Sequence, residues 1–541
     1  MNEVGFLVSQ IGHDAADPVR VVLRGPEGLV SPAARCRFVG RDGAVETSLS
    51  PFGPMWGSHW WTAEVTLPPG RYVAVAEDGR LHRESDPFEV GHDLLWHRTW
   101  MHVGPGQGRR RAVFAMNKVG WQDCGTAWQE ANSHAAYALG FLDLLEFRGD
   151  QLGPHRDEVI AQVRQGADYL ALLQDHAESR GHPKGSLSHQ TPKYDDVVLP
   201  GDAAKAAVVW ARAARLLPQA PEEYRLRAEE SLQWLHEARP HNPSGIHSPL
   251  HGAPPDYDPG DQETTRELMM RCWAHVELAL AGHAHLPIAV ALADQAISRQ
   301  VAMDENEGGL YGHFFTYPDR RFTEKAWTHH IDGGIFSPDA GGHFPNWVLP
   351  ILRLWQHWPD HPDALKWKRA LRSFAEGYLI PACGQNPFRL LPQGFYPGQG
   401  LLWFAGLWHG ITAAYGLTAA LALELARALE MPELRSMAVG NLQWIAGLNA
   451  GITRDSLKGS VMWSMDIPEG VALPASLIQG IGNRWAGNWL TIRGSICNGF
   501  AVGEQFRFGV APTLENDAPS SFTDEDWISH GGAWLSAVAR L

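Results

Sequence analysis

The sequence predicts a multidomain protein in which a small all-β sandwich is followed by a large all-α domain. Two observations carry this prediction. Short alternating segments separated by turn residues fill residues 2–91, whereas helical periodicity dominates after residue 110. The chain has 541 residues, which is more than one small core needs and leaves room for both parts.

The N-terminal part shows repeated strand signals. Trp60-Trp-Thr-Ala-Glu-Val-Thr-Leu67 alternates and is ended by Pro68-Pro-Gly70, and Arg71-Tyr-Val-Ala-Val-Ala76 alternates again before Asp78-Gly79. This spacing is typical of a small antiparallel β-sandwich, which we place at residues 1–92. Residues 93–112 are expected to be a linker, with a loop over Gly104–Arg110.

The remaining residues, 113–541, form the predicted helical domain. Many of its helices have alanine-rich faces, which allow helices to approach closely, and almost no strand separates them. Helices paired in this way are expected to wind into a ring or a solenoid. The expected helices cover residues 127–147, 156–174, 201–217, 221–238, 262–281, 286–300, 344–357, 362–379, 405–429, 432–447 and 526–541.

Three long connections, at residues 175–200, 301–343 and 448–525, interrupt these helices. Connections of this length inside a compact domain usually carry function. Loops gathered at one end of a helical ring would form a cleft, so we expect the functional site there.

Composition narrows the possible partners. The net charge of −15 gives no general attraction for phosphate backbones, so nucleic acid is not an expected partner. The chain holds 23 Trp and 11 Tyr, whose flat rings can stack on sugars. No stretch of about 20 apolar residues is present, so no membrane span is expected.

The five cysteines are isolated in the sequence and predict neither a disulfide framework nor a zinc site. The first residues are typical of a strand and not of a signal peptide, so a cytoplasmic location is expected. The oligomeric state stays open, with a homodimer as one option.

The last 20 residues, Phe522–Leu541, contain the first candidate for chemistry. Asp524, Glu525 and Asp526 run directly into the helix predicted from residue 526. Carboxylates in a first helical turn also suit the helix dipole without any catalytic role. Gly531 and Gly532 each cost a helix about 1 kcal/mol, which suggests that another element packs closely against that turn.

The second candidate is the turn Gly120-Trp-Gln-Asp-Cys-Gly-Thr126. It holds Trp121 and Asp123 between glycines, just before the first long helix. An aspartate there can simply cap a helix that starts near Ala127, and from the residues alone this reading is as good as a catalytic one.

These two motifs together resemble glycoside hydrolase family 9, in the subgroup with an immunoglobulin-like domain ahead of an (α/α)6 barrel. The family's G-W-x-D-A-G-D turn resembles residues 120–126, and its closing N-E-V-A-I-D-Y-N-A helix resembles residues 524–532. Further similarity lies in Phe6-Leu-Val-Ser-Gln-Ile-Gly12, Pro69-Gly-Arg-Tyr72 and Ser85-Asp-Pro-Phe-Glu-Val-Gly91. The resemblance covers nearly the whole chain in order.

The resemblance implies an inverting glycoside hydrolase acting on β-linked oligosaccharides of the gluco- or amino-sugar type. Glu525 matches the family's general acid, and Asp123 matches the aspartate that helps to hold the attacking water. An inverting enzyme needs these carboxyl groups about 6.5–9.5 Å apart so that a water molecule fits between them.

Thr126 departs from the family pattern, because it stands where the general base is expected. A threonine hydroxyl does not take a proton from water at neutral pH. Three readings follow: Asp123 is itself the base, another carboxylate replaces it, or phosphate attacks in place of water and the protein is a phosphorolytic enzyme. A carbohydrate-binding protein that has lost turnover is the alternative from another class. The replacement carboxylates considered are Glu130, Asp332, Asp517 and Asp524.

The expected substrate-binding residues are Trp121, Thr126, Asp332, Arg493 and His530. His530 stands at the position of a family tyrosine. His329, His330 and Asp332 could ligate a metal, but no matching third ligand is evident, and a hydrogen-bonded loop cluster is the favoured interpretation. No metal and no cofactor are therefore expected.

Overall fold

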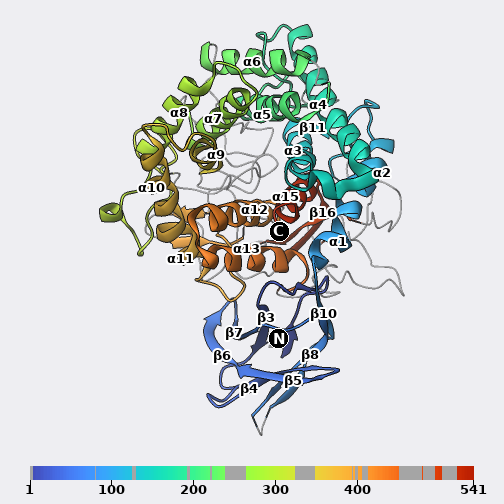
Figure 1. Cartoon of the computed structure of the whole chain (residues 1–541), viewed down its shortest axis with the longest axis vertical. Helices are drawn as coiled ribbons and strands as arrows, with labels where there is room; N and C mark the ends of the chain where they lie inside the picture. The colour runs from blue at the N-terminus through green and yellow to red at the C-terminus, as the bar shows by residue number, and fades with distance from the viewer. Residues whose placement is uncertain are drawn as a thin grey trace.

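The computed structural model describes residues 4–78, 81–124, 129–191, 195–219, 222–237, 263–322, 348–392, 394–396, 400–404, 412–449, 478, 494–501 and 521–541. A β-sandwich lies at one end of the molecule and a ring of helices at the other (Figure 1). This is the order of domains that the sequence predicts.

The sandwich consists of two mainly antiparallel sheets. Its core contains Val21, Leu23, Phe38, Ala74 and Phe88, which come from strands of both sheets. The first sheet has the order β1 (Gly5–Leu7), β3 (Val19–Gly25), β7 (Ser58–Val65), β6 (Ser50–Met55). The second has the order β2 (His13–Asp14), β10 (Phe88–Gly91), β8 (Gly70–Glu77), β4 (Arg35–Gly40), β5 (Gly43–Ser48), and β9 (His82–Glu84) pairs with β8.

Six inner helices form a closed ring among the described residues. Each one contacts the next, and the last contacts the first, which closes the ring as an (α/α)6 barrel. The inner helices are α3 (Ala131–Arg148), α5 (Pro200–Leu216), α7 (Thr265–Leu280), α9 (Leu349–His357), α12 (Thr412–Leu429) and α15 (Ile528–Val538).

An outer helix packs against each inner helix. In the order of the ring, the outer helices are α4 (Arg156–Ser179), α6 (Glu222–Glu237), α8 (Leu286–Ser298), α10 (Ala364–Phe374), α13 (Pro432–Ile445) and α1 (Leu94–Met101). The helix α10 continues through η6 (Ala375–Leu379) into α11 (Ile380–Cys383).

Glycines allow α3 and α15 to meet at the seam where the ring closes. A Cβ atom on Gly140 of α3 would lie 2.6 Å from the carbonyl oxygen of Gly532 on α15, so no side chain fits there. Gly532 likewise lies against the backbone of Ala136. This explains the glycine pair in α15, for which the sequence predicts a closely packed neighbour.

The structure corrects several predicted boundaries. Asp524, Glu525 and Asp526 do not start a helix: they end the strand β16 (Ser521–Asp526), which pairs with β15 (Cys497–Ala501), and α15 begins only at Ile528. The expected loop at residues 104–110 is helical, because η1 (His102–Gly106) leads into α2 (Gln107–Val113). Ahead of α3 lies the short strand β11 (Gln129–Glu130), paired with β12 (Gln190–Thr191).

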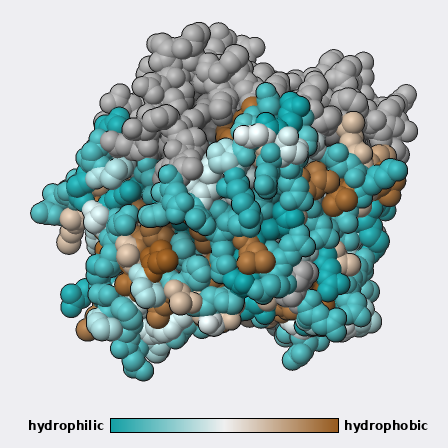
Figure 2. Space-filling model, turned by 90° about the horizontal axis from the view of Figure 1, so that it is seen from above, coloured by the Kyte–Doolittle hydropathy of each residue, from teal (hydrophilic) through white to brown (hydrophobic). Residues whose placement is uncertain are grey.

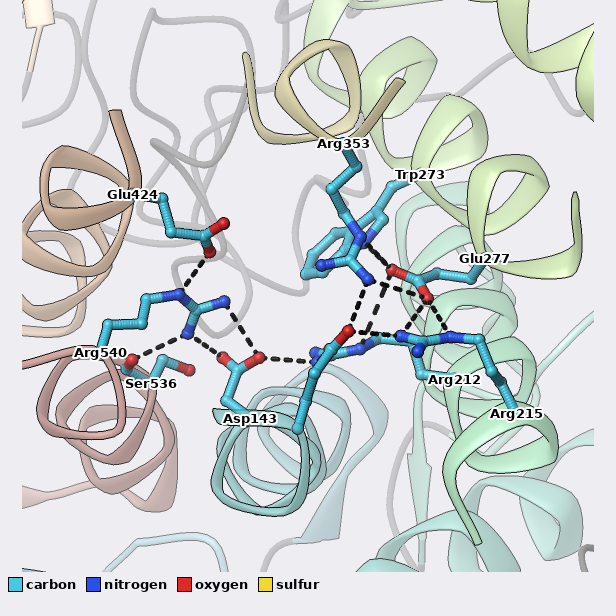
Figure 3. A network of polar contacts seen from close by, with 10 residues as sticks. Asp143, Arg212, Arg215, Trp273, Glu277, Arg353, Glu424, Ser536 and Arg540 are labelled. Atoms are coloured by element: carbon cyan, nitrogen blue, oxygen red, sulfur yellow. Dashed lines mark hydrogen bonds and ion pairs between the residues drawn. The ribbon is translucent and has the colours of Figure 1, made fainter. Parts of the chain in front are cut away.

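At the C-terminal ends of the inner helices, eight charged side chains form an ion network (Figure 3). Arg212 contacts Asp143 at 2.7 Å, Arg353 contacts Glu277 at 2.7 Å, and Arg540 contacts Glu424 at 2.5 Å. Each inner helix, or the turn that follows it, contributes at least one member. The network comprises Asp143, Glu146, Arg212, Arg215, Glu277, Arg353, Glu424 and Arg540.

The sandwich is fixed to the barrel through aromatic and polar contacts. Trp56, at the turn between β6 and β7, stacks on Phe388 with ring centroids 5.9 Å apart. Arg435 of α13 pairs with Asp17 at 2.5 Å. On the face of the molecule in Figure 2, the described residues are mainly hydrophilic and the hydrophobic ones form separate small groups.

Candidate active site

The turn that contains Asp123 is bonded directly to the start of the last inner helix. The carbonyl oxygen of Asp123 accepts the backbone N–H of Ile528 at 2.7 Å, and the N–H of Trp527 donates to Ile496 at 3.2 Å. The strand β16, which carries Glu525, ends two residues before Ile528. The fold therefore brings together the two motifs that lie 402 positions apart in the sequence; the side chain of Glu525 is outside the described part.

The carboxyl group of Asp123 is buried, and only one of its two oxygens has a hydrogen-bond partner within the described part of the chain. Its Oδ2 accepts the backbone N–H of Glu130 at 3.0 Å, just before α3 begins, which resembles the capping role considered from sequence. Its Oδ1 is buried and has no hydrogen-bond partner among the described residues. Burial raises the pKa of Asp123 to about 6, although the N–H of Glu130 and the charge of Arg111 oppose this rise.

Glu130 is a second buried carboxyl group beside Asp123. Its side chain is 3% exposed, and its Oε2 accepts from the Asn132 amide at 3.3 Å. Burial, followed by the negative charge of Asp123, raises the pKa of Glu130 to about 8. At neutral pH the pair therefore holds one proton, mainly on Glu130, and Asp123 carries the negative charge.

A buried histidine–aspartate pair completes the cluster. His189 Nδ1 donates to Asp202 Oδ2 at 2.8 Å, and both side chains are almost fully enclosed. Burial alone would lower the pKa of His189, but the charges of Asp202, Glu130 and Asp123 raise it. The neighbouring carboxylates thus favour the protonated form of this imidazole.

His134 of α3 holds the Asp123 turn through hydrogen bonds of both ring nitrogens. His134 Nε2 accepts the N–H of Trp121 at 2.8 Å, and Nδ1 donates to the carbonyl oxygen of Glu130 at 2.7 Å. Burial lowers the pKa of His134 to about 3, so the ring is neutral and its tautomer is set by these two contacts. Gly120 has a φ of +76°, and a Cβ atom there would lie 2.7 Å from this ring.

Trp121 is fully enclosed in the core. Its indole N–H donates to Gln162 Oε1 at 3.0 Å, and its ring packs on His134 and Tyr137. In this position Trp121 supports the Asp123 turn from behind.

A buried ion pair lies on the other side of the turn. Arg111 of α2 contacts Asp526 Oδ2 at 2.7 Å and also donates to the carbonyl oxygen of Gln122 at 3.3 Å. Both charged side chains are buried. The pair joins α2, the Asp123 turn and the end of β16, so it fixes the residue that follows Glu525.

His530 lies on α15, and its Nε2 is hydrogen-bonded to Asn498 Oδ1 of β15. Three other predicted binding residues, Thr126, Asp332 and Arg493, lie outside the described residues, as do His329 and His330. Sequence reasoning named Glu130 only as an alternative base and missed His189, Gln190 and Asp202. No local pattern marks these three residues, because the fold alone brings them to the Asp123 turn.

Among the described side chains, no group of three His, Cys, Asp or Glu residues is arranged to hold a metal ion. All five cysteines are buried thiols that form no disulfide. None of the helices among the described residues has the length and apolar character needed to cross a lipid bilayer.

Solved structures of glycoside hydrolase family 9 proteins share this fold over nearly the full chain. A metagenome-derived family 9 endoglucanase is 16% identical with a TM-score of 0.61, and the match covers 99% of this chain and 98% of that one. A Bacteroides ovatus family 9 protein is 14% identical with a TM-score of 0.61, again covering 99% and 98%.

A third match is AaCel9A in complex with cellobiose-like isofagomine. That protein is 13% identical with a TM-score of 0.60, and the match covers 99% of each chain. No family model and no curated protein match the sequence. At these identities the comparison establishes the fold, a β-sandwich followed by an (α/α)6 barrel of the family 9 type.

Proposed function

We propose that the protein is a glycoside hydrolase that cleaves β-linked oligosaccharides of the gluco- or amino-sugar type with inversion. The observation that carries this proposal is the bond between the Asp123 turn and the start of α15, because it brings a buried carboxylate close to the strand that bears Glu525. In this proposal residues 113–541 are the catalytic domain and residues 1–92 the immunoglobulin-like domain. Residues 93–112 connect the two in the sequence, and their helix α1 packs on α15 as part of the barrel.

In the proposed reaction, water attacks the anomeric carbon and gives its proton to Asp123. Glu525 gives its own proton to the oxygen of the leaving sugar, so that the two carboxyl groups exchange protonation states. A pKa of about 6 suits Asp123 to this role, because it is ionised at neutral pH and more basic than an exposed carboxylate. Oδ1, for which the described residues supply no partner, is the proposed acceptor for the water.

The environment of the two carboxyl groups favours Asp123 over Glu130 as the base. Glu130, whose pKa is raised to about 8, holds its proton at neutral pH and so is not available to accept another. Arg111 is already paired with Asp526, so it offers no free positive charge to an attacking phosphate. Water is the proposed nucleophile, because an ionised Asp123 can accept its proton.

Short oligosaccharides in the cytoplasm are the proposed substrates. The AaCel9A structure with cellobiose-like isofagomine supports a sugar ligand of this size for the fold. The net charge of −15 supports a neutral or cationic sugar over an anionic one.

The test is product formation from a panel of aryl glycosides, cello-oligosaccharides and glucosamine oligomers. We expect Glu525→Gln and Asp123→Asn each to lower kcat by about 10²- to 10⁴-fold, with Tm unchanged or raised. We also expect kcat/KM to fall as the pH is lowered through about 6, where Asp123 takes up a proton.

Ligand binding without product from any member of the panel would contradict hydrolysis and favour the binding protein. Product formation that requires phosphate would move the assignment to phosphorolysis. A fully active Glu525→Gln variant would show that Glu525 is not the acid.

A further inference from the structure

The two-stranded ribbon of β11 and β12 has two faces with different surroundings. Gln129 lies opposite Thr191, and Glu130 lies opposite Gln190. Directly opposite residues of an antiparallel pair point to the same face, and neighbours along a strand point to opposite faces. The ribbon therefore shows Gln129 and Thr191 on one face and Glu130 and Gln190 on the other.

Contacts on the first face confirm this geometry. Asn117 Nδ2 donates to Gln129 Oε1 at 2.9 Å and also to the hydroxyl of Thr191, while Gln129 Nε2 donates to the carbonyl oxygen of Val119 at 2.9 Å. Every polar group of the Gln129 side chain is thus used inside the protein. This face is structural.

On the second face, within the part of the chain that the structure describes, the glutamine side chain lacks the hydrogen bonds that Gln129 makes on the first. Gln190 is 1% exposed, and neither Oε1 nor Nε2 of its side chain has a hydrogen-bond partner among the described residues. A buried amide that has lost water and found no partner is strongly unfavourable and requires an explanation. A ligand that supplies both a donor and an acceptor would satisfy it.

The carboxyl groups of Glu130, on this face, and of Asp123, bonded to the ribbon's backbone, indicate what that ligand is. Glu130 shares the face with Gln190, and Asp123 Oδ2 is bonded to the backbone of Glu130, with its Oδ1 left as a buried acceptor. One amide and one carboxylate oxygen together offer a donor and two acceptors in an enclosed place. Sugar hydroxyl groups, which both donate and accept, match this set.

We propose that Gln190 is a substrate-binding residue of the candidate active site, and that its amide group binds hydroxyl groups of the sugar unit that lies against Asp123. The inference rests on the proposed function and adds a specificity-determining contact to it. The amide selects a sugar with a free hydroxyl group at the bound position, because a ligand without it would leave the buried amide unsatisfied.

The test compares Gln190→Met with Gln129→Met, which makes the same change on the structural face of the same ribbon. Methionine keeps the approximate length and volume of glutamine and removes the amide. The measurements are Tm without sugar, and the Kd for cellotetraose and for the β-1,4-linked glucosamine tetramer by calorimetry, with each variant in a Glu525→Gln background that prevents turnover.

We expect Gln190→Met to leave Tm unchanged or raised and to weaken binding about tenfold for whichever tetramer the parent protein binds. Gln129→Met should lower Tm and leave the Kd of the folded protein unchanged. A Gln190→Met variant that loses as much Tm as Gln129→Met, or that binds sugar as tightly as its parent, overturns the inference.

The outcome for the parent protein separates this inference from the proposed function. Binding by the parent that is weakened by Gln190→Met supports the inference, even if the wild-type protein releases no product and hydrolysis is rejected. A parent that binds neither tetramer overturns both.

Discussion

The two ends of the barrel use the same kinds of side chain in opposite ways. At the C-terminal ends of the inner helices, the ion network pairs every buried acid with an arginine. At the N-terminal ends, burial raises the pKa of both Asp123 and Glu130, and the charge of Asp123 raises that of Glu130 further. The acids at both ends are buried. The two ends differ in whether an arginine balances the charge of each acid.

The pKa values show the consequence of this difference. Burial alone would raise the pKa of Glu146, but Arg353, Arg212 and Arg215 hold it well below its ordinary value. Burial raises the pKa of Asp123 to about 6 and that of Glu130 to about 8. A carboxyl group that changes its protonation near neutral pH can exchange protons with a substrate, whereas a paired one cannot.

The comparison indicates a division of labour. At the network end the buried charges are paired, while the Asp123 end has buried polar groups that a ligand would satisfy under the proposed function. Changes at the two ends should therefore separate stability from activity, and three further predictions test this.

The largest effect is expected for Arg212→Met at the network end. Arg212 contacts Asp143 at 2.7 Å and Glu146 at 2.5 Å, and its removal leaves the network with four acids and only three arginines. We expect a loss of about 3–5 kcal/mol in the free energy of unfolding, measured with urea. The kcat/KM of the folded variant, measured well below its Tm, should match the wild type.

An Arg212→Met variant that unfolds like the wild type would show that the network does not stabilise the ring. One that is fully folded but inactive would show that the two ends are coupled.

A smaller and opposite effect is expected for Glu130→Gln at the Asp123 end. The pKa of Glu130 is raised above its unfolded value, so the folded protein binds more protons, and wild-type stability falls as the pH rises from about 4 toward 8. Glutamine does not titrate. The gain in unfolding free energy of Glu130→Gln over the wild type should therefore grow to roughly 1–3 kcal/mol between pH 5 and pH 9.

This gain is measured as the difference in Tm between variant and wild type in a series of buffers. A difference that stays constant with pH would show that Glu130 is ionised throughout, contrary to the shared proton inferred for the pair.

The smallest effect is expected for Lys366→Met, which removes an ion pair at the surface. Lys366 Nζ lies 2.6 Å from Asp294 Oδ1, but the two side chains are 44% and 39% exposed. We expect a change below about 1 kcal/mol in urea unfolding. A loss comparable with that of Arg212→Met would mean that burial does not explain the strength of the network.

The sequence was sufficient to predict the architecture because it depends on local periodicity. Alternation in Trp60–Leu67 indicates a strand, and helical repeats in the alanine-rich segments indicate helices, as the structure has them. The buried faces follow only from the fold, because Trp60 and Trp61 are both buried and so is every residue of α5 from Pro200 to Ala213. The boundary at Asp524–Asp526 was wrong for a physical reason: acidic residues next to a helix are typical of its first turn, but pairing with the distant strand β15 decided the conformation.

The candidate site was predictable only in part. The glycine-bounded turn marks Asp123 because its motif is contiguous. No sequence motif contains Gln190, His189 and Asp202. Their position at the site depends on the register between β11 and β12 and on where α5 begins. The burial that raises the pKa of Glu130 is likewise a property of the folded ring.

The glycine seam between α3 and α15 also sets an order of events during translation. The ribosome makes α3 early and α15 only with the last residues of this sequence, yet the two helices must meet backbone to backbone before the ring exists. The ring can therefore close only after α15 has been made and has left the ribosome. A chain that stops before Gly532 lacks the helix that packs on α3 and α12, so its ring stays open.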